Sequence, residues 1–141
     1  IGPRLLFFGE GYLVTSFIEG VFTMDWVASN SAVEIKKVLS NILQQCFVMD
    51  RMKVNKEEMH HPLKHIVVDS NNWPILIDFE RCALVEKSHN VTQFIEFICR
   101  IKKELEEKGI SVPVAKLREL SKQYKEEMTK ENLKTLISQV S

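Results

Sequence analysis

The order of strand-like and helix-like segments is the feature of this sequence that most restricts its fold. An apolar strand–turn–strand segment opens the chain, at residues 4–8 and 12–17. Apolar residues then recur at three- and four-residue steps over 25–53, as in an amphipathic helix. A second strand pair, at 66–68 and 73–77, precedes further helical segments. Hairpin, helices, loop, hairpin and helices in this order predict an α+β fold.

Local signals set the expected ends of several segments. Asn30 or Ser31 is expected to separate a short helix from a long one, and the polar stretch 54–64 is expected to form a loop. The apolar face beyond residue 88 predicts a helix that ends at Gly109. Pro113 is expected just inside the next helix, and Thr129 is expected to cap a last short one.

Composition excludes several classes of function. The 141 residues carry 19 Lys and Arg against 19 Asp and Glu, so no basic surface for nucleic acid is expected. No apolar run reaches the ~18 residues of a membrane span, so no membrane segment is expected. The cysteines Cys46, Cys82 and Cys99 have no Cys-x-x-Cys spacing, which argues against a disulfide framework or zinc knuckle. We therefore expect a cytoplasmic protein.

The first strand pair is too apolar to be exposed to water by itself. Its apolar and aromatic residues are Leu5, Leu6, Phe7, Phe8, Tyr12, Leu13, Val14 and Phe17. Two strands alone are marginally stable, and open strand edges invite further pairing. We therefore expect either strands upstream of Ile1 or a partner chain to cover the pair, and self-association through it is one form of that expectation. The first residue is not Met, which also suggests residues upstream.

The segment Lys64–Glu80, KHIVVDSNNWPILIDFE, carries the clearest chemical signal. A strand ends in Ile77-Asp78-Phe79, one tight hairpin after a polar loop. A carboxylate at a strand end suits Mg²⁺, which takes few protein oxygens and otherwise uses phosphate and water. The structural alternative is an Asp that caps the following turn.

Three motifs together resemble the protein-kinase-like superfamily. IVVD…PILIDFE resembles its hairpin and metal-binding motif, and YLVTSFIEG, residues 12–20, is similar to the strand and hinge that hold adenine. The likeness is greatest to the small RIO-type and archaeal Ser/Thr kinases, in which a Val-Thr-Gln-Phe-like helix follows, here residues 90–94. The resemblance spans about residues 4–99. It implies N-lobe strands and a hinge at 1–20, and a helical C-terminal lobe with a catalytic-loop hairpin at 21–141.

The resemblance also implies roles for individual residues, with ATP and Mg²⁺ as cofactors. Asp78 would bind the metal ion, and Glu58 would stand where the catalytic Asp is found. His65 or Lys64 would stand at or near the position of the second metal ligand, and Lys64 could also neutralise phosphate charge. Backbone groups of the hinge would hold adenine, at Ser16, Phe17 and Ile18.

Several residues depart from the kinase pattern. Lys56 or Asn55 stands in place of the expected His, Glu58 is longer than Asp, and Glu80 follows Asp78-Phe79 where Gly is usual. The 141 residues contain no Gly-rich phosphate loop and no strand Lys paired with a helix Glu. We therefore expect no measurable kinase activity from these residues alone.

Three functional hypotheses follow. The first is an ATP-dependent phosphotransferase of the Ser/Thr protein kinase type, present here as an incomplete domain that binds nucleotide and a protein substrate or partner. The second is a pseudokinase-like interaction module without catalysis. The third is a transition-metal site built from His60, His61 and His65, with Glu58 as a further ligand.

Overall fold

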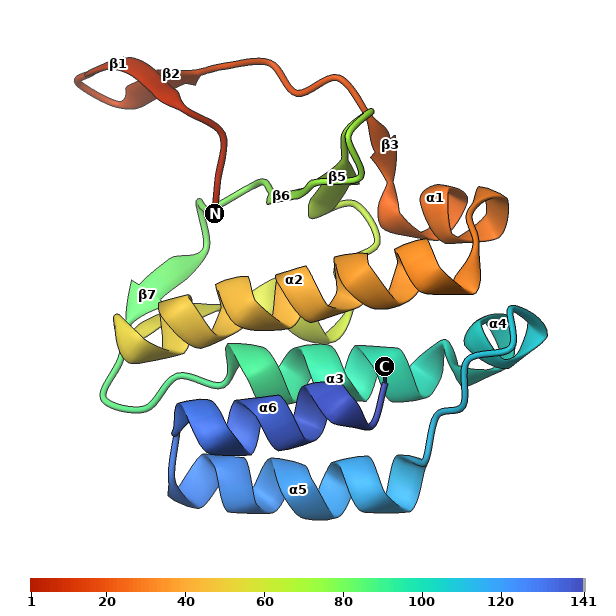
Figure 1. Cartoon of the computed structure of the whole chain (residues 1–141). Helices are drawn as coiled ribbons and strands as arrows, with labels where there is room; N and C mark the ends of the chain where they lie inside the picture. Colours follow the sequence, from red (N-terminus) through yellow and green to blue (C-terminus); the bar gives the residue numbers. More distant parts are fainter. Residues whose placement is uncertain (141) are drawn as a thin grey trace.

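A computed structural model describes residues 1–140 (Figure 1). The helices are α1 (Thr23–Ser29), α2 (Ala32–Arg51), the 3₁₀ helix η1 (Glu57–His60), α3 (Asn90–Arg100), α4 (Lys102–Glu107), α5 (Val114–Glu126) and α6 (Lys130–Ser138). The strands are β1 (Leu5–Gly9), β2 (Tyr12–Thr15), β3 (Val21–Phe22), β4 (Val54–Lys56), β5 (Ile66–Val68), β6 (Pro74–Leu76) and β7 (Cys82–Leu84). They form small antiparallel sheets, ordered β1-β2, β3-β5-β6 and β4-β7. The predicted α+β class is confirmed.

Helix α3 is the centre of the hydrophobic core. Its side chains Val91, Phe94, Ile95, Phe97 and Ile98 are all buried, because they recur at helical spacing on faces that meet other elements. Helix α2 packs on one side of α3, while the α5–α6 pair covers another (Figure 1). Each such buried side chain contributes about 1.5–3 kcal/mol, so this packing fixes the platform on which the small sheets lie.

The expected helix boundaries are largely confirmed, with two corrections. Ser31 caps α2 in a capping box with Glu34, and Thr129 caps α6. The helix expected over 88–109 is divided at Ile101, whose backbone leaves the helical conformation so that α4 turns Leu105 back into the core. Pro113 is the N-cap of α5 and not its first residue, since its ψ of 78° is not helical.

The stretch 54–64 is not simply a loop, which corrects the expectation from its polarity. Residues Val54–Lys56 form β4 and pair with β7, in the register Val54↔Leu84 and Lys56↔Cys82. Neither strand was expected, and β3 was also missed. Three-residue strands are specified by partners distant in the sequence, so their local pattern carries little signal.

Hairpin β5–β6 agrees closely with the expected second strand pair. Its turn is closed by Asp69, whose side chain accepts hydrogen bonds from the backbone amides of Asn71 and Trp73. Asn72 adopts a left-handed conformation with φ of 60° and accepts a hydrogen bond from Trp26 Nε1 on α1. These contacts fix the hairpin against α1, and with it the strand that leads to Asp78.

Hairpin β1–β2 stands apart from the helices (Figure 1). The predicted strand–turn–strand hairpin is confirmed. Phe8 lies opposite Leu13, and Gly11 in the turn adopts a left-handed conformation. Phe8 is 73% exposed and Leu13 69%, so the apolar surface of this hairpin is open to solvent in the described part of the chain. Among the described helices, none is long and apolar enough to cross a membrane.

The connection from the hairpin to the body passes through Gly20. A Cβ atom on this residue would lie 2.3 Å from the carbonyl oxygen of Val68, which is far inside van der Waals contact. Only glycine therefore allows the chain to approach β5 this closely as it enters β3. This contact sets where the segment before Gly20 lies relative to hairpin β5–β6.

Candidate functional site

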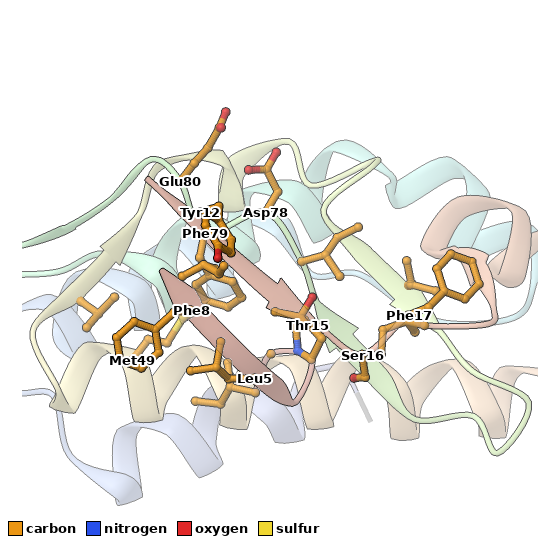
Figure 2. A pocket seen from close by; sticks show the side chains of 18 of the residues that line it. Leu5, Phe8, Tyr12, Thr15, Ser16, Phe17, Met49, Asp78, Phe79 and Glu80 are labelled. Carbon is orange, nitrogen blue, oxygen red and sulfur yellow. The ribbon is translucent and has the colours of Figure 1, made fainter. Parts of the chain in front are cut away.

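An open pocket of about 1430 Å³ lies between hairpin β1–β2 and the body of the molecule (Figure 2). The hinge-like segment lines it with Ser16, Phe17 and Ile18, and the segment that follows β6 lines it with Ile77, Asp78, Phe79 and Glu80. Apolar side chains from the hairpin and from α2 complete the lining, among them Leu5, Phe8, Leu13, Met49 and Met52. Two segments that the resemblance assigned to nucleotide binding thus share one pocket.

The hinge-like segment has free backbone groups. The amide of Ser16 donates to the carbonyl of Arg4, and the Ser16 hydroxyl accepts from the Arg4 amide, so the Ser16 N–H is already used by the hairpin. Within residues 1–140, Phe17 and Ile18 make no such hydrogen bond. Of the three residues expected to hold adenine, Phe17 and Ile18 therefore have amides available, while Ser16 retains its carbonyl.

Asp78 lies at the edge of this pocket in an unusual backbone conformation. Its φ is 60°, in the left-handed region that costs a non-glycine residue about 1–2 kcal/mol. In Figure 2 its carboxylate and that of Glu80 point the same way, away from Leu5 and Met49. The side chain is 44% exposed. Left-handed residues held by the surrounding structure concentrate at functional sites, which supports a role for this carboxylate beyond capping a turn.

Lys56 is the central contact of the site and is completely buried. Its ammonium group donates a hydrogen bond to the carbonyl oxygen of Asp78, lies 3.5 Å from Oε2 of Glu58, and lies 5.1 Å from the ring centroid of Phe79. Burying an ammonium group costs free energy unless the group is paired. The folded chain therefore needs all of these contacts to hold Lys56 in this position. The sequence shows Lys56 only as a departure from the expected His, and this role was not predicted. The available signal was its place two residues before Glu58.

Glu58 comes from η1, directly after β4. Its side chain is 17% exposed, and the guanidinium Nε of Arg81 lies 4.0 Å from Oε1. Atom Oε2 is shielded from solvent and accepts no hydrogen bond in the described chain, although the Lys56 ammonium is near. The neighbouring Glu57 is exposed. Of these two adjacent glutamates, only Glu58 therefore points into the site.

His65 faces Asp78 from the residue before β5. Its Nδ1 atom lies 3.5 Å from Oδ2 of Asp78, is shielded from solvent, and has no hydrogen-bond partner among residues 1–140. The carbonyl of His65 accepts from the amide of Ile77, which fixes the two residues across hairpin β5–β6. An unpartnered ring nitrogen beside a carboxylate fits a bound cation. Lys64, by contrast, is exposed and has no hydrogen bond or ion pair with the described residues.

A buried polar network holds β4 in place beneath the site. The Asp50 carboxylate accepts hydrogen bonds from the amides of Asn90 and Val91 and from the Tyr124 hydroxyl. The Asn90 side chain accepts from the Lys56 amide and donates to Asp50 and to the carbonyl of Val54. Burial, and then the Asp50 charge, raise the pKa of Tyr124 well above its ordinary value. The network joins α2, α3 and α5 to the strand that carries Lys56.

The expected three-histidine metal site is not formed. Nδ1 of His60 contacts the carbonyl of Glu57, and His61 is exposed. No three His, Cys, Asp or Glu side chains in residues 1–140 are grouped so that they could hold a metal ion by themselves. Cys82, on β7, is a free thiol. Any cation at Asp78 and His65 would therefore need ligands from outside the protein.

The arrangement brings together most of the expected site. Glu58 and Asp78 meet through Lys56, and His65 faces Asp78 at the edge of a pocket whose other wall is the Ser16–Ile18 segment. Chemically, it offers a carboxylate and an imidazole for a cation, a second carboxylate for a proton, and an apolar space for a ring. Comparison of the sequence with protein-family models and with curated proteins gives no match.

Proposed function

We propose that this chain contains the hinge and the helical lobe of an ATP-dependent phosphotransferase of the Ser/Thr protein kinase type. The supporting observation is the linkage of Glu58, Lys56 and Asp78 at the edge of a pocket that is also lined by Ser16–Ile18. Phosphoryl transfer depends chiefly on positioning and electrostatics, so a fixed arrangement of charged groups beside an open, largely apolar pocket is the relevant evidence.

In this proposal the adenine ring occupies the apolar pocket. The free amides of Phe17 and Ile18 and the carbonyl of Ser16 offer donors and an acceptor to its edge. Phe8, Met49 and Phe79 offer the apolar surface that covers its faces. Pockets of this kind combine an apolar lining with a few fixed polar groups that set orientation.

The charged residues take the remaining roles. Asp78 and His65 hold a divalent cation, which would neutralise charge on the phosphates of a bound nucleotide. Glu58 accepts the proton of the attacking hydroxyl through Oε1, because Oε2 is shielded from solvent and faces the Lys56 ammonium. Lys56 positions both carboxylate-bearing residues, because one ammonium contacts the side chain of Glu58 and the backbone of Asp78.

The test is calorimetric titration of ATP with Mg²⁺ or Mn²⁺ into the chain. We expect binding that needs a divalent cation and that Asp78→Asn weakens by about tenfold or more, since one charged ligand is lost. Glu86→Gln, a matched carboxylate-to-amide change on an exposed residue, is expected to bind as the unaltered chain does. Equal binding by the Asp78 variant would show that the assignment is wrong.

Catalysis is tested in the full-length protein. There, phosphoryl transfer from ATP is expected to fall by two or more orders of magnitude in Glu58→Gln, in line with the usual contribution of a general base of about 10²–10⁴. Glu57→Gln, at the adjacent exposed glutamate, is the control and is expected to retain activity. Unchanged transfer in the Glu58 variant would remove that residue from the mechanism.

The second candidate is a non-catalytic, pseudokinase-like interaction module. The observation that favours it is Glu80, which follows Asp78-Phe79 and adds a second carboxylate beside the first (Figure 2). Like charges side by side disfavour a phosphate-rich ligand. The same titration separates the two candidates, because no nucleotide binding with any divalent cation favours the interaction module.

A further inference from the structure

The donors at the candidate cation site are unlike those of an ordinary magnesium site. The two side chains that face each other are a carboxylate, Asp78, and an imidazole, His65. Magnesium is a hard ion that takes oxygen ligands and rarely gives up water for nitrogen, whereas imidazole suits the first-row transition ions. The identity of the second ligand therefore bears on which ion the site selects.

The geometry suits two ligands on one ion. Nδ1 of His65 and Oδ2 of Asp78 are 3.5 Å apart. Two donors that each lie about 2.1 Å from a common ion can be at most about 4.2 Å apart, so this separation lies within reach. The ring nitrogen faces the Asp78 carboxylate and makes no hydrogen bond in the described part of the chain, so no competing hydrogen bond holds it.

The protein donors are limited to these two, because no third His, Cys, Asp or Glu side chain in residues 1–140, Glu80 included, is grouped with them so that it could hold the ion. Glu58 is engaged by the Lys56 ammonium at 3.5 Å and has Arg81 at 4.0 Å, so its charge is already balanced. The Asp78 carbonyl oxygen is taken by the same ammonium. One imidazole and one carboxylate remain, and phosphate oxygens and water would complete the coordination.

We propose that this site selects a divalent transition ion, Mn²⁺ in the test below, over Mg²⁺ when nucleotide binds. The inference rests on the proposed function, because the phosphates supply ligands that residues 1–140 do not. The physical reason is that Mn²⁺ accepts carboxylate, phosphate and imidazole ligands alike, while Mg²⁺ gains little from the nitrogen. The nitrogen of His65 is thus the determinant of metal preference.

The first experiment compares binding constants. Calorimetric titration of ADP into the chain is expected to give a dissociation constant about tenfold or more lower with MnCl₂ than with MgCl₂. His65→Asn replaces the nitrogen donor by an amide oxygen, and we expect it to reduce the ratio of the two constants to near one. His60→Asn makes the same change at an exposed histidine at the end of η1 and is expected to keep the full ratio. Thermal unfolding of each variant verifies that it is folded.

The second experiment detects the bond itself. Electron spin echo measurements on the Mn²⁺–ADP complex report nitrogen nuclei bound directly to manganese. We expect a nitrogen signal in the unaltered chain and in His60→Asn, and its absence in His65→Asn. This readout does not depend on affinity or on catalytic activity.

The outcomes separate this inference from the proposed function. Equal ADP binding with Mn²⁺ and Mg²⁺, or a manganese complex without bound nitrogen, overturns the metal preference while leaving the nucleotide site intact. In that case His65 serves as an ion-pair partner of Asp78 or of phosphate. No ADP binding with either ion overturns both proposals.

Discussion

The ammonium group of Lys56 lies 3.5 Å from Oε2 of Glu58, and this pair is held between strand β4 and helix η1 with the lysine wholly buried. The same ammonium donates to the carbonyl of Asp78, in the segment between β6 and β7. A single cation therefore sets the distance between two acidic residues that are twenty positions apart in the sequence. The predictions below begin from this contact.

Replacing Lys56 by Met is expected to lower the free energy of unfolding by about 1–3 kcal/mol. The methionine can fill the space but removes the ammonium that lies beside Oε2 of Glu58, so a shielded carboxylate loses its charge partner, which is the costly arrangement for a buried charge. Urea denaturation followed by circular dichroism measures the change. Lys64→Met, the same substitution at an exposed lysine, is expected to have no effect. The double variant Lys56→Met/Glu58→Gln should recover part of the loss, and a purely additive double variant would contradict the pairing.

Substitution of Asp78 by glycine is expected to affect the free energy of unfolding and nucleotide binding in opposite directions. Asp78→Gly removes the left-handed strain and should leave the unfolding free energy unchanged or raise it by about 0.5–1 kcal/mol, while metal-dependent nucleotide binding is lost. Asp78→Ala loses the same carboxylate without relieving the strain, so it should be less stable than the glycine variant. The comparison needs thermal unfolding and calorimetry on both. Equal stability of the two would show that the backbone at this position is not strained.

Gly20→Ala is expected to destabilise the chain by about 1–3 kcal/mol, because its methyl group would collide with the carbonyl of Val68. The backbone must shift to accept it, and the entry to β3 then loosens. Amide hydrogen exchange should show reduced protection at Val21 and Phe22. Gly109→Ala is a useful contrast, since nothing lies near its added Cβ and its cost comes from the φ of 79° alone. Unchanged protection in the Gly20 variant would contradict the close approach.

Asn90→Ala is expected to cost about 3 kcal/mol of stability, near the upper range for one substitution. It leaves the Lys56 amide and the Val54 carbonyl without partners and removes one donor from Asp50. Because Asn90 fixes β4, nucleotide binding should weaken as well. Asn71→Ala, at an exposed turn residue, is the control for both measurements. A loss of binding without any loss of stability would contradict this structural role.

The capping box of α2 is expected to depend on pH. Hydrogen bonds from the Ser31 hydroxyl and then the Ser31 amide hold the pKa of Glu34 below its ordinary value of 4.5. Because the folded-state pKa is depressed, this stabilisation is complete above pH 4.5 and is lost as the pH falls through the folded value. The melting temperature of Glu34→Gln should therefore fall below that of the unaltered chain at neutral pH, and the gap should close on acidification. Glu107→Gln, at an exposed glutamate, should show no such gap.

Part of the candidate site could be predicted because its signals are local. The Ile77-Asp78-Phe79 strand end, the turn at 69–72 and the cap at Ser31 each depend on a few adjacent residues. The role of Lys56 could not be predicted in this way, since it depends on the pairing of β4 with β7, which are separated by 25 residues between Lys56 and Cys82. The predicted metal site of His60, His61 and His65 was wrong, because side chains that are close in the sequence face different partners. His60 contacts the carbonyl of Glu57, whereas His65 faces Asp78.

By itself the sequence determined the longer helices, the helix caps at Ser31 and Thr129 and the two hairpins, since periodicity, turn residues and capping side chains act over one or two turns of chain. Only the tertiary structure decided which glutamate enters the site, which histidine faces Asp78, and that a lysine joins them. The physical reason is that a buried charge is tolerated only where partners from distant segments converge on it, and that convergence is set by the packing of α2, α3 and the small sheets.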